Sequence, residues 1–121
     1  MRETKFRAWD SKTNNWFDND EGDLYIELNG NINFGWNGEI MDDYTDRVIL
    51  MQYTGRKDSE GNEIYEGDIL QNEHHFKYQV VFKGDCWRCE PLKRNGFKNR
   101  FIGSDLKKIG NVYENKGLLG D

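Results

Sequence analysis

Residues Met51 to Gln71 read MQYTGRKDSEGNEIYEGDILQ, and they alternate strand-forming with turn-forming residues more sharply than the rest of the chain. Leu50 to Tyr53 has strand character. Asp58 to Asn62 is a turn cluster, in which Gly61 can adopt a positive φ without a steric penalty. Gly67 begins a second corner, directly before the next strand. This stretch therefore predicts two strands, two tight turns and a β-rich fold around them.

Period-two alternation predicts β-hairpins before this stretch. Phe6 to Asp10 alternates and is followed by a turn and by Trp16-Phe17, which predicts a first hairpin. Asn29-Gly30 is the strongest hairpin signal, because both residues tolerate the positive φ of a type I′ turn. Asn37-Gly38 closes the strand that follows. For Glu39 to Arg47 the spacing of the apolar residues predicts a loop or one helical turn.

The C-terminal half contains the clearest strand of the sequence, His75 to Lys83, where apolar and polar side chains alternate. Gly84-Asp85 turns the chain, and Cys86 to Leu92 is predicted to return antiparallel. Lys107 to Ile109 is a candidate edge strand that closes a barrel. This order of strands and turns resembles small SH3-like barrels. We therefore expect a mainly β fold with little helix: a small SH3-like barrel meander in the C-terminal half, joined to N-terminal β-hairpins.

The length of the chain fits one domain. At 121 residues and 14.3 kDa we expect a single domain over residues 1–121, with two small β lobes, about 1–50 and 51–121, as the alternative. Only 36% of the residues are hydrophobic, but 14% are aromatic. Because each aromatic ring buries a large area, this composition still allows a packed core.

Charge is distributed unevenly along the chain. Residues 1–73 carry 17 acidic and 7 basic side chains, whereas residues 74–121 carry 5 acidic and 10 basic ones, and the formal net charge is −5. Two interpretations stay open. The charges form a solvated mixed surface, or they form a surface that binds a partner or another copy of the chain head to tail.

Three blocks of the sequence stand out together: the central MQYTGRKDSEGNEIYEGDIL, KFRAWD at residues 5–10 and IGNVYEN at residues 109–115. They resemble the YopX family of small proteins encoded by bacterial phages and prophages. The blocks occur in the family's order and span nearly the whole chain, whereas residues 19–45 and 73–103 match no motif. The resemblance implies a β-rich phage protein whose biochemical role is unassigned.

Cys86 and Cys89 form a C-x-x-C motif, and His74 and His75 precede it, so the set has the ligand count of a structural zinc site. Strand geometry argues against such a site. Residues three positions apart on a strand lie about 10 Å apart and point to opposite faces, and neighbouring histidines diverge as well. A redox role would need a helix N-terminus that lowers the pKa of a thiol. We therefore expect no metal ligands and two reduced thiols.

Carboxylates crowd the central stretch at Glu60, Glu63, Glu66 and Asp68. Hydrolytic chemistry would need two of them in a concave site with separated pKa values. We expect instead that Asp68 accepts backbone hydrogen bonds at its corner, as Asp does in turns. The sequence has neither a nucleophile-elbow serine nor a phosphate-binding glycine loop. We therefore expect no catalytic residue, no cofactor and no enzymatic activity.

The basic loop near the C-terminus is the best candidate for contact with a partner or a nucleic acid. Its cations could neutralise phosphates and its aromatic ring could stack on a base. The candidate contact residues are Lys93, Arg94, Phe97, Lys98 and Arg100. A sequence pI of about 5.1 is, however, far from that of a dedicated nucleic-acid binder, and a solvated loop is the competing interpretation.

No apolar run approaches the roughly 20 residues that cross a bilayer, and the first residues lack the apolar core of a secretory signal. We therefore expect a protein of the bacterial host cytoplasm, with no membrane contact.

The expected function is that of a phage or prophage accessory protein: a non-enzymatic interaction module that binds a host or phage protein. The alternative is a small β-barrel that binds single-stranded nucleic acid through the loop Lys93–Arg100. Homo-oligomerisation stays open, because exposed β edges invite pairing.

Overall fold

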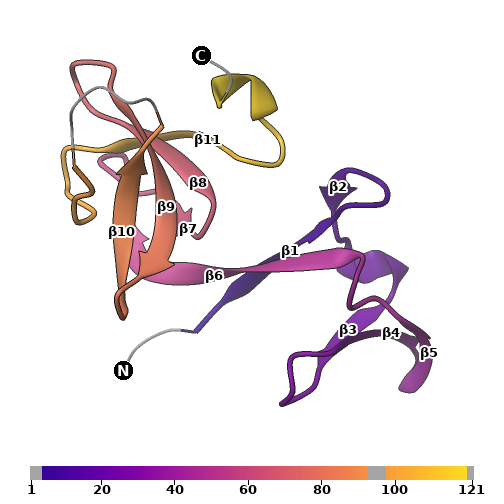
Figure 1. Ribbon diagram of the computed structural model, residues 1–121. Helices are drawn as coiled ribbons and strands as arrows, with labels where there is room; N and C mark the ends of the chain where they lie inside the picture. The colour runs from indigo at the N-terminus through magenta and orange to yellow at the C-terminus, as the bar shows by residue number, and fades with distance from the viewer. Residues whose placement is uncertain (1–3, 93–97, 120–121) are drawn as a thin grey trace. The chain divides into compact units, whose positions relative to one another are not determined.

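The computed structural model describes residues 4–92 and 98–119, which form an almost entirely β structure (Figure 1). Within these residues it contains eleven strands and two short 3-10 helices, η1 (Asn19–Glu21) and η2 (Lys116–Leu118). The strands are β1 (Phe6–Asp10), β2 (Asn15–Trp16), β3 (Asp23–Ile26), β4 (Ile32–Trp36), β5 (Glu39–Asp43), β6 (Val48–Lys57), β7 (Glu63–Tyr65), β8 (Asp68–Gln71), β9 (Lys77–Lys83), β10 (Cys86–Pro91) and β11 (Lys107–Asn111). The predicted mainly β fold class is confirmed. No helix in the described ranges has the length and apolar character needed to cross a membrane.

The chain divides into two compact units. The N-terminal unit comprises Arg7–Leu50, and the C-terminal unit comprises Met1–Phe6 with Met51–Asp121. Strand β6 passes from the first unit into the second, because the division falls between Leu50 and Met51.

The N-terminal unit contains a hairpin and a three-stranded antiparallel sheet. Strands β1 and β2 pair with Trp9 opposite Trp16, and the two indole rings meet edge to face at 5.1 Å. The separate sheet has the order β3–β4–β5. Trp9, Ile32 and Val48 are the buried hydrophobic residues of this unit. The two hairpins predicted around residues 11–15 and Asn29-Gly30 are therefore confirmed.

Strand β5 corrects the prediction of a loop or one helical turn over Glu39 to Arg47. The residues Asn37 and Gly38 have φ values of 53° and 83°, so they reverse the chain tightly and bring β5 back along β4. Gly35 pairs with Ile40 and Phe34 with Asp42, which leaves Met41 as the extra residue of a β-bulge. Because the bulge adds Met41 directly after Ile40, two apolar residues follow each other and the local sequence lacks the period of two that marks a strand.

The C-terminal unit is organised around a four-stranded antiparallel sheet with the order β10–β9–β8–β11. Val80 of β9 pairs with Cys89 of β10, and both side chains are fully buried. The core consists of Ile64, Leu70, Tyr78, Val80, Cys89, Ile102 and Leu106. The predicted antiparallel pair over residues 75–92 and the predicted edge strand at Lys107 are confirmed, and the likeness to an SH3 barrel stays a prediction.

Candidate functional site

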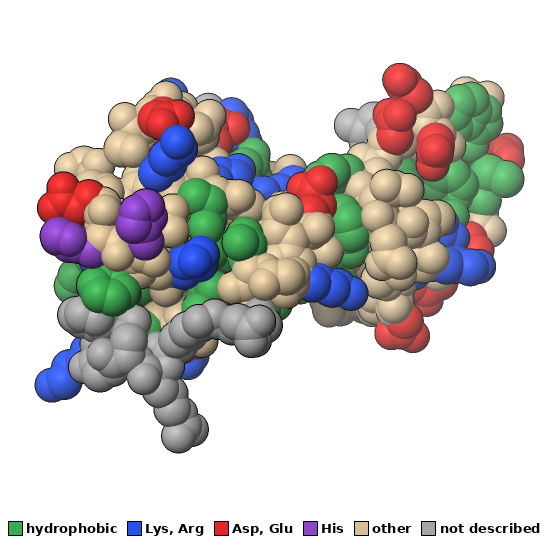
Figure 2. Space-filling model, turned by 90° about the horizontal axis from the view of Figure 1, so that it is seen from above, with side chains coloured by type: hydrophobic (Ala, Val, Ile, Leu, Met, Phe, Trp, Pro, Cys, Tyr) green, Lys and Arg blue, Asp and Glu red, His purple; other side chains and the backbone are tan. Residues whose placement is uncertain are grey.

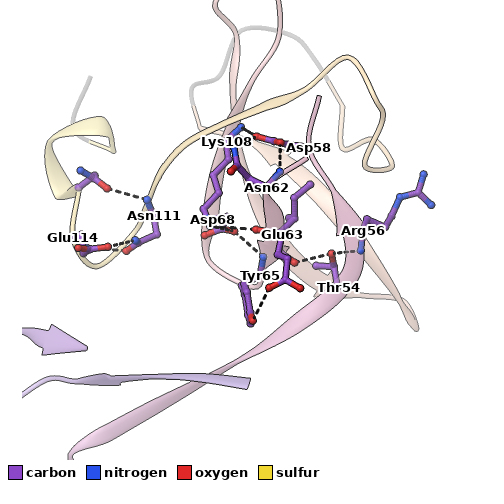
Figure 3. Close-up of polar contacts among 12 residues, drawn as sticks. Thr54, Arg56, Asp58, Asn62, Glu63, Tyr65, Asp68, Lys108, Asn111 and Glu114 are labelled. Carbon is purple, nitrogen blue, oxygen red and sulfur yellow. Dashed lines mark hydrogen bonds and ion pairs between the residues drawn. The ribbon is translucent and has the colours of Figure 1, made fainter. Parts of the chain in front are cut away.

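Asp58 of the central stretch is buried and binds the backbone around it. Its carboxylate accepts hydrogen bonds from the N–H groups of Glu60 (2.9 Å), Asn62 (2.8 Å) and Lys108 (2.9 Å). Burial raises the pKa of this carboxyl, but the hydrogen bonds from Lys108 and Asn62 outweigh it and hold the pKa below its usual range. Asp58 therefore fixes its own turn and ties that turn to β11 (Figure 3).

Asp68 is fully buried at the second corner of the stretch. Its Oδ2 accepts a 2.7 Å hydrogen bond from the N–H of Tyr65, as predicted for an Asp at a turn, and lies 3.3 Å from Nζ of Lys108 (Figure 3). The same Lys108 ammonium donates to the carbonyl of Glu63 at 3.2 Å. The charge of Asp68 is thus matched by a cation and by a backbone donor, which holds β7, β8 and β11 together.

The last family-like block contains a third buried polar side chain, Asn111. Its Oδ1 accepts hydrogen bonds from the N–H groups of Tyr113 (2.9 Å) and Glu114 (2.8 Å), and its Nδ2 donates to the carboxylate of Glu114 at 2.8 Å. Together with Asp58 and Asp68, Asn111 stabilises corners of the C-terminal unit. These side chains support the fold through contacts with their own backbone.

Part of the predicted basic-loop site lies outside the described residues, namely Lys93, Arg94 and Phe97. Lys98 is exposed. Arg100 donates to both carboxylate oxygens of Asp105, at 3.0 and 2.7 Å, and these bonds hold the pKa of the Asp105 carboxyl below its usual range. The charge of Arg100 is therefore engaged within its own loop.

The cysteines and histidines occupy separate surroundings. Cys89 is in the hydrophobic core, where burial raises the pKa of its thiol to about 11. Cys86 lies at the β9–β10 turn, and its Sγ is 3.6 Å from the carbonyl oxygen of Lys83. His74 is exposed, and His75 adopts a φ of 67° in the turn before β9. Within residues 4–92 and 98–119, no three His, Cys, Asp or Glu side chains form a group that could hold a metal ion.

A surface that the sequence analysis did not single out lies on the N-terminal unit. Six of the ten exposed large hydrophobic residues in the described part of the chain fall between residues 25 and 41. They are Tyr25, Ile26, Leu28, Trp36, Ile40 and Met41. Arg7–Leu50 also carries 10 acidic but only 3 basic side chains. We call these six residues with their acidic neighbours the 25–41 surface; Figure 2 shows red carboxylates beside green hydrophobic side chains on the face of this unit that is seen.

The β3–β4–β5 register divides the side chains of this sheet between two faces. On one face, the ring of Phe34 stacks on Tyr44 at 4.9 Å and meets Phe17 edge to face at 6.1 Å. On the other face, Gly35 lies opposite Ile40, and a Cβ built at Gly35 would be 2.6 Å from the ring of Tyr25. The missing side chain at Gly35 thus leaves room for the Tyr25 ring close to the backbone of β4.

One pattern in the sequence could have indicated the exposed apolar side chains of the 25–41 surface. Asp and Glu normally accompany turns, but residues 23–43 combine five of them with adjacent apolar pairs such as Tyr25-Ile26 and Ile40-Met41. An apolar pair on a strand sends one side chain to each face. In a small sheet covered on one face, at least one member of each pair must then remain exposed, and in these two pairs both members are exposed.

Comparisons with known proteins found one matching family and similar solved structures, each over nearly the whole chain. A family model described as YopX protein matches residues 5–120. The crystal structure of protein EF1440 from Enterococcus faecalis is similar, with a TM-score of 0.61 and 24% identity, covering 98% of this chain and 99% of that one. That of protein YopX from Bacillus subtilis is similar with a TM-score of 0.62 and 21% identity, at the same coverage.

At these identities the two structures show a shared fold alone. None of the curated proteins matches the chain. The family model nevertheless spans all three blocks that carried the resemblance, from the KFRAWD segment to the IGNVYEN segment. The chain therefore belongs to the YopX family.

Proposed function

We propose that this chain is a non-enzymatic interaction module that binds a host or phage protein through the 25–41 surface. One observation carries the proposal: the concentration of exposed apolar side chains in an acidic unit. Soluble monomers rarely expose contiguous apolar patches larger than roughly a few hundred Å², and patches above that size mark interaction sites. Ile40 and Met41 are 62% and 65% exposed on adjacent positions of one strand, so contact with a partner would remove their apolar area from water.

The proposal of a protein without chemistry of its own draws support from the central stretch. Its two buried carboxylates, Asp58 and Asp68, are engaged by backbone N–H groups and by Lys108. A general acid or base must instead reach a substrate proton. Of the four acidic residues considered for hydrolytic chemistry in this stretch, Asp68 is thus accounted for by turn formation.

The accessory role in a phage or prophage and the cytoplasmic location are part of the same proposal. They rest on the YopX family resemblance and on the composition of the chain. The partner would carry a basic, partly apolar surface, because the N-terminal unit carries a net charge of −7 from its 10 acidic and 3 basic side chains.

The alternative, binding of single-stranded nucleic acid through the loop Lys93–Arg100, has less support. Arg100 is engaged by Asp105, and a stacking platform needs several free cations beside its aromatic rings. A gel shift with a single-stranded oligonucleotide at about 50 mM salt tests it, since electrostatic binding is strongest at low salt. A shift that disappears with salt and with Lys93→Ala and Lys98→Ala would favour this alternative.

The test of the proposed function compares three forms of the full chain as bait in bacterial host lysate. The first is the unchanged chain, the second carries Leu28→Ser, Ile40→Ser and Met41→Ser, and the third carries Phe82→Ser and Phe101→Ser as a matched control. All five residues are more than half exposed, so each change alters the surface of a folded protein. We expect one protein that the first and third baits capture and the second does not.

That protein is then purified and titrated with each bait by calorimetry. Stoichiometric binding to the unchanged chain, weakened about tenfold or more by the three N-terminal changes, supports the proposal. Identical capture by all three baits, or binding that only the Phe82 and Phe101 changes weaken, contradicts it. Circular dichroism of each bait confirms that the β fold is kept.

A further inference from the structure

We infer that β5 (Glu39–Asp43) is a docking edge for an extended segment of a partner protein in which basic and apolar residues alternate. The inference rests on the proposed function, and adds where and by what chemistry the partner binds. Strand β5 lies at the edge of the β3–β4–β5 sheet, and all five of its residues are exposed. An exposed edge strand is a template for pairing with another strand.

The backbone of β5 has groups that point away from β4. The N–H of Tyr44 donates to the carbonyl of Ile32 at 2.8 Å, so this position is bonded across to β4. In an antiparallel ladder, neighbouring residues alternate, and the N–H of Asp43 therefore points outward. There it donates to the carboxylate of Asp42 in its own strand at 2.8 Å. A side chain thus occupies the place that a carbonyl of an added strand would take.

A basic partner can release that amide. A Lys or Arg of the added strand would bind the Asp42 carboxylate, and the Asp43 N–H would then be free to donate to the partner backbone. Asp43 itself is held in place, because its carboxylate accepts hydrogen bonds from the hydroxyl (2.5 Å) and the N–H (2.8 Å) of Thr45. The exchange therefore costs a local side-chain bond and gains an ion pair and a ladder bond.

The side chains of β5 define which residues the added strand should carry. Glu39 pairs with Trp36 and Asp42 with Phe34, so both acidic side chains lie on one face of the sheet. Ile40 pairs with Gly35 on the other face, beside the Tyr25 ring. A strand laid along β5 would meet the acids Glu39 and Asp42 on the first face and Ile40 on the second, where the carboxylate of Asp43 is already engaged by Thr45. Alternating Lys and Val matches both, because opposite charges and apolar pairs across strands are favourable.

The same charges disfavour a second copy of this chain as the occupant. An antiparallel pair of two β5 strands centred on Met41 would place Glu39 of each copy opposite Asp43 of the other. Like charges directly opposite each other destabilise a strand pair. The bulge at Met41 further distorts the edge for a partner with the same irregularity. The chemistry of this edge thus fits a basic strand of another protein.

The test uses the full chain and a blocked eight-residue peptide of alternating lysine and valine as the probe. We expect binding in a fluorescence-anisotropy titration, with NMR shifts at residues 39–43 and slower hydrogen exchange of the Asp43 amide. A second peptide carries N-methyl groups on the residues that face β5, which removes its hydrogen-bond donors. It should bind at least tenfold more weakly if pairing is by backbone.

A charge swap supplies the matched control. The double variant Glu39→Lys, Asp42→Lys should bind the lysine–valine peptide about tenfold more weakly and should gain affinity for a glutamate–valine peptide. The variant Asp20→Lys, Glu21→Lys changes the net charge equally on η1 and should keep most of the affinity. Equal loss in both variants means attraction by net charge alone and overturns the docking edge.

Three further results overturn the inference: no binding of the lysine–valine peptide at millimolar concentration, equal binding of the N-methylated peptide, or NMR shifts that fall outside β5 and its neighbour β4. The proposed function fails separately. If the lysate experiment yields a partner that depends on Leu28, Ile40 and Met41 but tolerates the charge swap at Glu39 and Asp42, the protein interaction stands and the β5 edge is wrong. If no such partner exists, the proposed function is wrong whatever the peptide does.

Discussion

The corners of the C-terminal unit and the β3–β4–β5 sheet of the N-terminal unit use acidic residues in opposite ways. Asp58 and Asp68 are buried, and backbone N–H groups and Lys108 surround their carboxylates. Glu39 and Asp42 are exposed, next to exposed apolar side chains. The comparison teaches that the residues easiest to recognise in the sequence maintain the fold, whereas the candidate binding surface lies where no motif was found.

Removal of the Asp68 carboxylate tests the structural half of this comparison and has the largest expected effect. Asp68→Ala removes the carboxylate that lies 3.3 Å from the partly buried Lys108 ammonium and that accepts the hydrogen bond of the Tyr65 N–H. We expect a loss of roughly 3–5 kcal/mol in the free energy of unfolding. Urea denaturation followed by tryptophan fluorescence measures it.

The matched control is Glu60→Ala in the same stretch. The Glu60 carboxylate pairs with Lys107 at 3.0 Å, but both side chains are 56% exposed, so the change should alter stability by less than about 0.5 kcal/mol. Asp68→Asn keeps an acceptor for Tyr65 and should fall between the two. Equal effects of the Asp68 and Glu60 changes would refute the assignment of Asp68 as a structural residue.

A methyl group at Gly35 tests the packing of the N-terminal sheet and has the next largest effect. Its Cβ would lie 2.6 Å from the Tyr25 ring and 2.6 Å from the carbonyl oxygen of Glu39. Because the second contact is with backbone, β5 must shift, and we expect Gly35→Ala to cost about 1–3 kcal/mol. Gly117→Ala is the control, since nothing lies within 4 Å of its Cβ position. Unfolding curves that coincide for the two variants would contradict the described register.

Asp10 is an exception within the N-terminal unit, because it is a buried acid there. The guanidinium of Arg47 donates to it from Nε (2.9 Å) and Nη2 (2.7 Å), and these hydrogen bonds hold the pKa of the Asp10 carboxyl below its usual range. A carboxyl with a lowered folded-state pKa stabilises the fold above its unfolded-state pKa, and this contribution is lost as the pH falls through the folded-state value.

We therefore expect Asp10→Asn to cost about 1.5 kcal/mol at neutral pH, and the difference from the unchanged chain to shrink as the pH falls below about 4. Thermal unfolding of both proteins between about pH 3 and 7 measures it. A stability difference that stays constant over this range would show that the ion pair with Arg47 contributes little.

The sequence predicted most of the fold because its turns have local chemical signals. Asn29-Gly30, Asn37-Gly38 and the corner at Gly67 are all positions where a glycine adopts a positive φ. Period-two alternation then located β9 and β10 within a few residues. The prediction of a loop or helical turn at β5 was wrong, because the bulge at Met41 is set by pairing with β4 and not by the local sequence.

The candidate surface could not be predicted in the same way. Exposure of Ile40 and Met41 depends on which elements cover which face of the sheet, and this is a tertiary property. The basic loop was predicted as a contact site because cations beside aromatic residues form a recognisable pattern. In the structure, however, Arg100 donates hydrogen bonds to Asp105, five residues further on. The role of Asp68 at its corner, in contrast, followed from turn chemistry alone and is confirmed.

The smallest effect on stability is expected for Glu39→Lys combined with Asp42→Lys, the variant that should have a large effect on binding. Both side chains are exposed, and the bond from the Asp43 N–H to Asp42 can be replaced by water. Stability should therefore change by less than about 0.5 kcal/mol, compared with several for Asp68→Ala. The same urea denaturation measures both. A large loss of stability in the double variant would mean that the acids of β5 support the sheet as Asp58 and Asp68 support their corners, and the contrast between the two regions would no longer hold.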